Sequence, residues 1–249
     1  MNLKDSINIL AQTENGSFTE TGIHNTSRHV VGVEQKLGLI ILTQGNSQDF
    51  NQPAYKSVEI MLDDMELNLS AKIKSSQLSG FAASQCMSES LENINEYLCS
   101  QSANSETVDE TNGVELAAIQ IHQSSISYCS VGKVNCLVFN DNLGLQVLAV
   151  DNSAQEKLGI ETSLQAEVAE HDVVVGDIVV LLPSDLLNLL TPDFIRITLS
   201  RFNQNLEMAL RQINTRALQN DLPEKPTIAL CRVNQMTEKK RSWFGKIRK

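Results

Sequence analysis

The sequence predicts an α+β fold in which helices pack outside an antiparallel sheet core. Short apolar runs rich in β-branched residues occur at the start, middle and end of the chain, and helix-period patterns form separate blocks between them. Several of these runs are too apolar for edge strands, so both faces of the sheets should be covered. Segregated blocks of strands and helices are typical of α+β layers.

The composition indicates a large core with few aromatic residues. Of the 249 residues, 41% are hydrophobic and only 4% aromatic, so Leu, Ile, Val and Ala must fill most of the interior. The net charge of −10 argues against a nucleic-acid interface spread over the surface. The five cysteines form no C-x-x-C pair, which predicts reduced thiols rather than a metal cluster or a disulfide framework.

The sequence predicts a cytoplasmic protein. The N-terminal stretch MNLKDSINILAQ is too short and too polar for a secretory signal. No run approaches the roughly 18 apolar residues that a membrane-spanning helix needs.

The first part of the chain should form strands and then two helices. Strands are predicted at residues 7–12, 29–33 and 37–42. From Ala54 the apolar spacing changes to i, i+3, i+4, which predicts a helix. A second helix is predicted from Leu78 to Leu98. The polar residues 100–113 predict an exposed loop, either a plain connector or a docking site for a partner.

A block of strands follows. The predicted strands cover residues 114–121, 125–131, 134–139 and 145–150. Asn140-Asp141-Asn142 with Gly144 is typical of a hairpin turn, and residues 151–172 read as a polar stretch.

The stretch 173–190 should form a tight turn at Gly176-Asp177, a buried strand over 178–182 and a short helix. Two roles fit Asp185. It is of the residue type that caps a helix such as 186–190, and it stands where a buried strand would deliver an acid to a metal or catalytic site.

The chain should end in two helices and a strand. Thr191-Pro192-Asp193 is a typical helix start. Apolar residues at helical spacing mark a further helix over 206–217, and TIALCRV (227–233) predicts the last strand.

The order of these elements and several degenerate motifs resemble the PPM-type family, the metal-dependent (type 2C) serine/threonine protein phosphatases, in their compact bacterial form. The most specific parts are residues 131–159, which belong to the stretch that resembles the block around Gly-Asp-Ser-Arg, and 176–187, which resemble Gly-Asp-x-Leu-Leu-Leu-x-Ser-Asp-Gly-Leu. ILAQTENGSFTETG, LGLIILTQGNSQ and KPTIALCRV resemble the opening strand, the Ala-Asp-Gly strand and the terminal Asp-Asn strand.

The resemblance covers about residues 7–234. It implies a four-layer α-β-β-α sandwich with two mostly antiparallel sheets flanked by helices. We expect residues 1–235 to form this phosphatase-like domain and residues 236–249 to form a basic amphipathic tail.

The resemblance also implies two divalent cations held by acids at strand ends, and most of these acids are replaced here. Gln44-Gly45 stands at the Asp-Gly of the second motif, and Lys133 replaces the acid of the third. Asp185 is the one unchanged ligand position, and the terminal Asp-Asn has become Glu224-Lys225.

The opening motif has lost its acids too. Gly22-Ile23-His24 lies where Asn-Glu-Asp belongs, and Thr19 lies near the position of the phosphate-binding Arg. Arg28 is either a substitute phosphate binder or a solvent-facing side chain.

We therefore expect no cofactor. Loss of one carboxylate removes a charge interaction of about 4 kcal/mol at a separation of about 4 Å. Since each 1.4 kcal/mol is about tenfold, that is roughly a thousandfold in metal affinity.

The basic tail is the strongest charge asymmetry in the chain. Residues 239–249 hold six of the 20 Lys and Arg residues and no acid. Its candidate contact residues for a membrane or a partner are Lys239, Lys240, Arg241, Trp243, Phe244 and Lys246. A disordered end, contact with an anionic membrane and docking to an acidic partner all fit this composition.

The main hypothesis is a catalytically inactive pseudophosphatase that acts in signalling by binding a protein, such as a kinase or a phosphoprotein. A rival is a weak phosphatase that holds Mg²⁺ or Mn²⁺ with Asp185, Glu224 and a shifted acid such as Asp49. A third is a scaffold tethered to a membrane or a partner through the basic tail. No nucleic acid and no small-molecule cofactor are expected.

Overall fold

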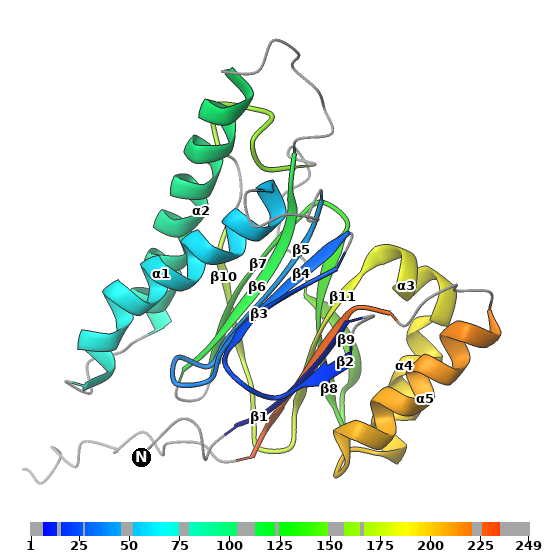
Figure 1. The fold of residues 1–249 in the computed structure, drawn as a ribbon. Helices are drawn as coiled ribbons and strands as arrows, with labels where there is room; N and C mark the ends of the chain where they lie inside the picture. Colours follow the sequence, from blue (N-terminus) through cyan, green and yellow to red (C-terminus); the bar gives the residue numbers. More distant parts are fainter. Residues whose placement is uncertain are drawn as a thin grey trace, which may run out of the picture.

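In the described part of the chain, two six-stranded antiparallel sheets lie face to face between two helical layers (Figure 1). The computed structural model describes residues 7–13, 16–26, 28–45, 52–74, 80–103, 113–122, 125–148, 157–164, 167–220 and 226–234. The predicted α+β four-layer sandwich is therefore confirmed.

The first sheet combines the two ends of the chain with its middle. In spatial order its strands are β2 (Gly16–Phe18), β1 (Ile7–Thr13), β12 (Ile228–Val233), β11 (Ile178–Pro183), β8 (Val134–Asn140) and β9 (Gly144–Leu148). All neighbouring strands are antiparallel. The first and last described strands pair directly, because β1 lies beside β12 over six residue pairs.

The second sheet contains the strands between these segments. In spatial order they are β10 (Ala169–Asp172), β7 (Ser125–Val131), β6 (Glu115–His122), β5 (Leu39–Gln44), β4 (His29–Glu34) and β3 (Gly22–Asn25). The chain passes from β7 in this sheet to β8 in the other through Gly132 and Lys133. Gly132 has a φ of 78°, a left-handed conformation that favours glycine.

Two groups of helices cover the outer faces of the sheets (Figure 1). The helices are α1 (Pro53–Lys74), α2 (Gly80–Ala103), α3 (Ser184–Leu190), α4 (Pro192–Arg201) and α5 (Leu206–Gln219). Helices α1 and α2 pack on the second sheet, and α3, α4 and α5 pack on the first.

The apolar strands are buried on both faces, which explains their unbroken hydrophobic runs. In β11, Val179 and Leu181 point into the core between the sheets, whereas Val180 and Leu182 point towards the helices. The interior thus consists of three layers of side chains, one between the sheets and one beneath each helical group.

Several predicted boundaries need correction. Residues 100–103 belong to the last turn of α2 rather than to a loop, and residues 104–112 lie outside the described residues. The polar stretch 151–172 contains β10. Strands β2 and β3 were not predicted either. These three strands are short and none is fully buried, so apolar runs do not mark them.

The predicted strand over 37–42 begins two residues later, at Leu39. Residues 35–38 form a turn in which Gly38 has a φ of 65°. The predicted strand 145–150 is β9, and its last two predicted residues lie outside the described ranges.

The cysteines are free thiols, and all but Cys99 are buried. Burial raises the pKa of Cys129 to about 12, so its reactive thiolate form is suppressed. Among the described helices, none has the length and apolar character needed to cross a bilayer.

Candidate functional site

Three of the predicted site positions, at Gln44, Lys133 and Asp185, come together at one edge of the sandwich. Gln44 at the end of β5 pairs with Glu115 at the start of β6. The Lys133 N–H donates to Glu115 Oε2 at 3.0 Å, and the Ser184 N–H donates to the Lys133 carbonyl at 2.8 Å. The ends of β5, β7 and β11 and the start of β6 therefore meet here. We call this the strand-end site.

Asp185 does not cap the helix, which corrects one of its two predicted roles. Helix α3 begins at Ser184, its N-cap position is Pro183, and no side chain makes a cap hydrogen bond. Asp185 is an exposed acid in the first turn, where the positive end of the helix dipole favours a negatively charged side chain. The Ser184 hydroxyl instead accepts from Asn135 Nδ2 at 2.8 Å, which joins α3 to β8.

The second predicted motif lies beside an arginine. Gln44 and Gly45 are half-buried, and the Gly45 N–H donates to the Arg28 carbonyl at 3.0 Å. Arg28 is exposed, as the solvent-facing interpretation expects. Its position beside Gly45 also places it at the strand-end site.

The opening motif supplies an aromatic contact rather than an acid. His24 in β3 stacks on Phe18 of β2, with ring centroids 3.3 Å apart. Partial burial lowers the pKa of His24, which favours its neutral form. Thr19 is exposed, and its carbonyl accepts from the Gln35 side chain.

Sequence reasoning missed Glu115. Its side chain is only 7% exposed, and the hydrogen bond from Lys133 partly compensates for the loss of water. Its signal in the sequence is a single acid at the start of a largely apolar strand. Such an acid becomes a site candidate only when its neighbours are known.

The described residues of the strand-end site do not fit a pair of divalent cations. The described carboxylates here are Glu115 and Asp185, and the main chain of the exposed residue Lys133 lies between their chain segments. Across the described ranges, no three His, Cys, Asp or Glu residues are placed so that they could hold a metal ion. The predicted residues Glu224, Lys225 and Asp49 lie outside these ranges.

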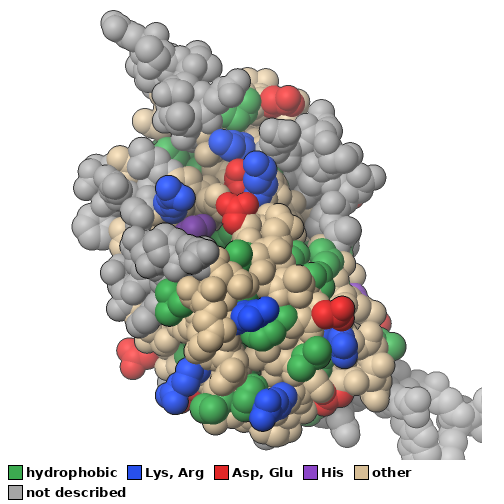
Figure 2. Space-filling view, turned by 90° about the vertical axis from the view of Figure 1, so that its right-hand side faces the viewer, with side chains coloured by type: hydrophobic (Ala, Val, Ile, Leu, Met, Phe, Trp, Pro, Cys, Tyr) green, Lys and Arg blue, Asp and Glu red, His purple; other side chains and the backbone are tan. Residues whose placement is uncertain are grey.

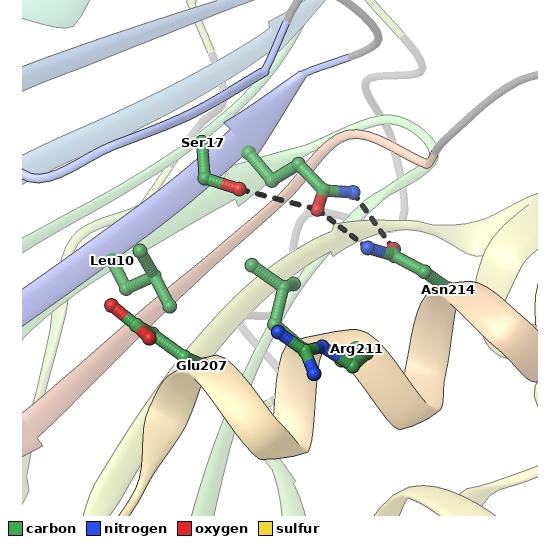
Figure 3. Close-up of a pocket in the computed structure, with 7 residues that line it drawn as sticks. Leu10, Ser17, Glu207, Arg211 and Asn214 are labelled. Atoms are coloured by element: carbon green, nitrogen blue, oxygen red, sulfur yellow. Dashed lines mark hydrogen bonds between the residues drawn. The ribbon is translucent and has the colours of Figure 1, made fainter.

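A separate pocket of about 250 Å³ lies on the helix side of the first sheet, between β1, β2 and α5 (Figure 3). Leu10 and Leu210 contribute its apolar surface. Ser17 of β2 lies on one side, and Glu207 and Arg211 project from α5 (Figure 3). None of these residues was a predicted site residue.

The predicted contact residues of the tail lie outside the described residues. These are Lys239, Lys240, Arg241, Trp243, Phe244 and Lys246. Their role stays a prediction.

Comparison with solved structures finds bacterial serine/threonine phosphatases. PppA of Pseudomonas aeruginosa, described as a key regulatory component of T6SS, aligns with a TM-score of 0.68 and 13% identity over 91% of this chain and 96% of PppA. The Mycobacterium tuberculosis serine/threonine phosphatase PstP/Ppp aligns with a TM-score of 0.67 and 11% identity over 92% and 100% of the two chains.

The catalytic domain of PstP has also been solved in complex with two manganese ions. It aligns with a TM-score of 0.64 and 12% identity, covering 92% of this chain and 99% of that domain. Sequence comparison finds no matching family model and no matching curated protein. The chain thus has the fold of the PPM-type phosphatases, as the resemblance implied.

Proposed function

We propose that this chain is a pseudophosphatase, which keeps the PPM phosphatase fold but lacks a two-metal hydrolytic centre and acts by binding another protein. The contact among Gln44, Glu115 and Lys133 carries the proposal. Gln44 pairs with Glu115 across two strands, and the Glu115 side chain already accepts the main-chain N–H of the exposed residue Lys133.

Charge balance supports the loss of metal binding. Mg²⁺ and Mn²⁺ are hard ions that need oxygen ligands, and carboxylates supply most of the neutralising charge. Two such ions bring four positive charges to a site whose described acids are Glu115 and Asp185. The third motif position brings the positively charged residue Lys133 instead of a further acid, so it supplies no neutralising charge.

Glu115 is poorly suited to replace a lost ligand. It is buried, and its Oε2 accepts the N–H of Lys133 at the turn between the two sheets. A metal bound to that oxygen would compete with this hydrogen bond. We assign Glu115 the structural role of fixing the β7–β8 turn.

Binding to a protein is the function that remains available to an intact scaffold of this kind. The three side-chain layers of the core are complete in the described residues, so the surface loops have a rigid support. The partner class that suits a phosphatase-like protein is a kinase, a phosphoprotein or another signalling component. PppA, which shares the fold, is itself described as a regulatory component.

Calorimetry with Mn²⁺ and Mg²⁺, together with hydrolysis of a phosphothreonine peptide, tests the proposal. We expect no saturable metal binding at millimolar concentration and no hydrolysis above the buffer rate. Metal binding that disappears in Asp185→Ala but persists in Asp193→Ala would show that the proposal is wrong. Asp193 is a matched control, since it is an exposed acid in the first turn of the neighbouring helix α4.

A variant with restored charge tests the physical reason. Gln44→Asp combined with Lys133→Asp adds two carboxylates and removes the positive charge of Lys133. We expect this variant to bind Mn²⁺ more tightly than the natural chain, because the two substitutions make the net charge three units more negative.

A further inference from the structure

The pocket between α5 and β2 presents two charged groups that form no ion pair with each other. Glu207 and Arg211 are four residues apart on α5, and both line the pocket (Figure 3). Residues at this spacing commonly form an ion pair. Here neither forms one with any residue that the structure describes, whereas Arg196 on α4 pairs with Asp193 at 3.5 Å. Among the described residues Arg211 thus has no carboxylate partner, so a carboxylate from outside can pair with it.

The inner wall of the pocket is held in place by paired amides. Gln12 Nε2 donates to Asn214 Oδ1 at 2.7 Å, and Asn214 Nδ2 donates back to Gln12 Oε1 at 2.6 Å. Gln12 is only 2% exposed and also donates to the Pro226 carbonyl at 3.0 Å. These bonds join β1 to α5, so the pocket keeps its shape without a ligand, which lowers the entropic cost of binding.

The outer strand of the first sheet, as the described residues form it, borders the same pocket. Strand β2 is the last strand of the first sheet and pairs with β1 alone among the described strands. Its Ser17 lines the pocket. An exposed edge offers main-chain N–H and C=O groups to an additional extended strand, which is a recurring mode of peptide recognition.

The helical face around the pocket is basic compared with the rest of this acidic chain. Helices α3 to α5 carry four arginines against three acids, whereas α1 and α2 carry seven acids against three lysines. Arg201 and Arg216 lie over the rings of Phe202 and Phe194 and form no ion pair with a described carboxylate. Figure 2 shows Lys and Arg side chains interspersed with hydrophobic ones on this face, with Asp and Glu side chains among them.

We propose that the pocket between α5 and β2 binds an extended, acidic segment of a partner protein. A carboxylate of the segment meets Arg211, its main chain extends the sheet at β2, and an N–H group of the segment meets Glu207. This inference deepens the protein-binding function proposed above and rests on it. Glu207 in the pocket and the net charge of −10 disfavour a nucleic acid.

Peptide selection with the full chain tests the inference. The probe is a displayed library of random twelve-residue peptides, and selection is followed by fluorescence anisotropy with the best synthetic peptide. We expect the selected peptides to share an Asp or Glu. We expect Arg211→Glu to weaken binding by about tenfold to a hundredfold, the value of one charge-assisted hydrogen bond. Replacing the shared acid by Lys should restore affinity for Arg211→Glu.

Arg196→Glu is the matched control, because Arg196 is exposed on the neighbouring helix and already has a carboxylate partner. It should leave the affinity unchanged, and circular dichroism should show that both variants are folded. Hydrogen exchange of the complex should show protection at β2 and α5. The inference is overturned if no acid is enriched, if Arg211→Glu binds the peptide as well as the natural chain does, or if protection falls elsewhere. None of these outcomes depends on metal binding, so this inference can fail while the pseudophosphatase proposal stands.

Discussion

His122 is a buried histidine that joins two sheet strands to a helix through hydroxyl groups. Its ring nitrogens lie 2.9 Å from Ser127 Oγ and 3.1 Å from Ser125 Oγ. Ser127 Oγ lies 2.9 Å from Ser84 Oγ of α2, and Ser84 donates to Glu170 Oε1 at 2.9 Å. Burial lowers the pKa of His122, and the charge of Glu170 opposes this shift only in part.

This arrangement predicts a loss of stability in mild acid. His122 has an ordinary pKa of 6.5 in the unfolded chain and a lower pKa in the folded chain. As the pH falls, the unfolded chain therefore binds this proton first. The stabilising contribution of neutral His122 is fully present above pH 6.5 and is lost as the pH falls from there towards the lowered folded pKa.

Urea unfolding between about pH 7.5 and pH 5.5 measures the effect. As the pH is lowered over this range, we expect the free energy of unfolding to decrease less in His122→Gln than in the natural chain. Equal slopes in the natural chain and in His122→Gln would contradict the role of His122.

At the scale of elements, the contact of α1 with the second sheet depends on a glycine. A Cβ atom added to Gly32 in β4 would lie 2.4 Å from Val58 Cγ1 and 3.4 Å from Leu62 Cδ1. No real Cβ contact is as short as the first, so α1 approaches the sheet to a distance that only glycine permits here. The sequence pattern predicted the helix but not this close approach.

Gly32→Ala should therefore destabilise the chain by overpacking, by about 1–3 kcal/mol. Chemical denaturation measures the change. Adding Val58→Ala to Gly32→Ala should recover part of the loss, because it removes the clashing methyl group.

Gly45→Ala is the matched glycine control. A Cβ atom there would meet its nearest neighbours at 3.6 Å, which is ordinary contact, so we expect a much smaller change. If the Gly32→Ala chain were as stable as the Gly45→Ala chain, helix α1 would be able to shift away from the sheet without a loss of stability.

At the scale of the whole molecule, the last described strand, β12, is an interior strand of the first sheet and lies between two other strands. Strand β12 pairs with β1 on one side and β11 on the other, and Val233 near its end pairs with Ile7. The Val233 N–H also donates to the Asp177 carbonyl at 2.9 Å. The main-chain bonds and core contacts of β12 are thus made by residues up to Val233.

A chain that ends at Asn234 should unfold at the same temperature as the full chain. This expectation follows from the predicted boundary between the domain, residues 1–235, and the basic tail, residues 236–249. Differential scanning calorimetry of the two chains checks it. A clear fall in melting temperature on truncation would show that the tail contributes to the folded unit.

The sequence alone determined the fold class, most of the long elements and the replacement of strand-end acids. Buried strands and amphipathic helices follow from local apolar patterns, and the replacement of an acid by Gln44 or Lys133 is visible once a motif is aligned. The observed ends of elements differ from the predicted ones where a local turn or a neighbouring layer sets the end of an element. Examples are the start of α3 at Ser184 and the end of α2 at residues 100–103.

Only the tertiary structure decided which polar groups meet. Glu115 reaches Lys133 through strand register and the turn between sheets, and Gln12 meets Asn214, 202 residues away, through the packing of α5 on β1. The edge strands β2, β3 and β10 likewise depend on neighbours rather than on their own residues. Local sequence sets the period of burial, but register and layer packing are long-range properties that no single segment encodes.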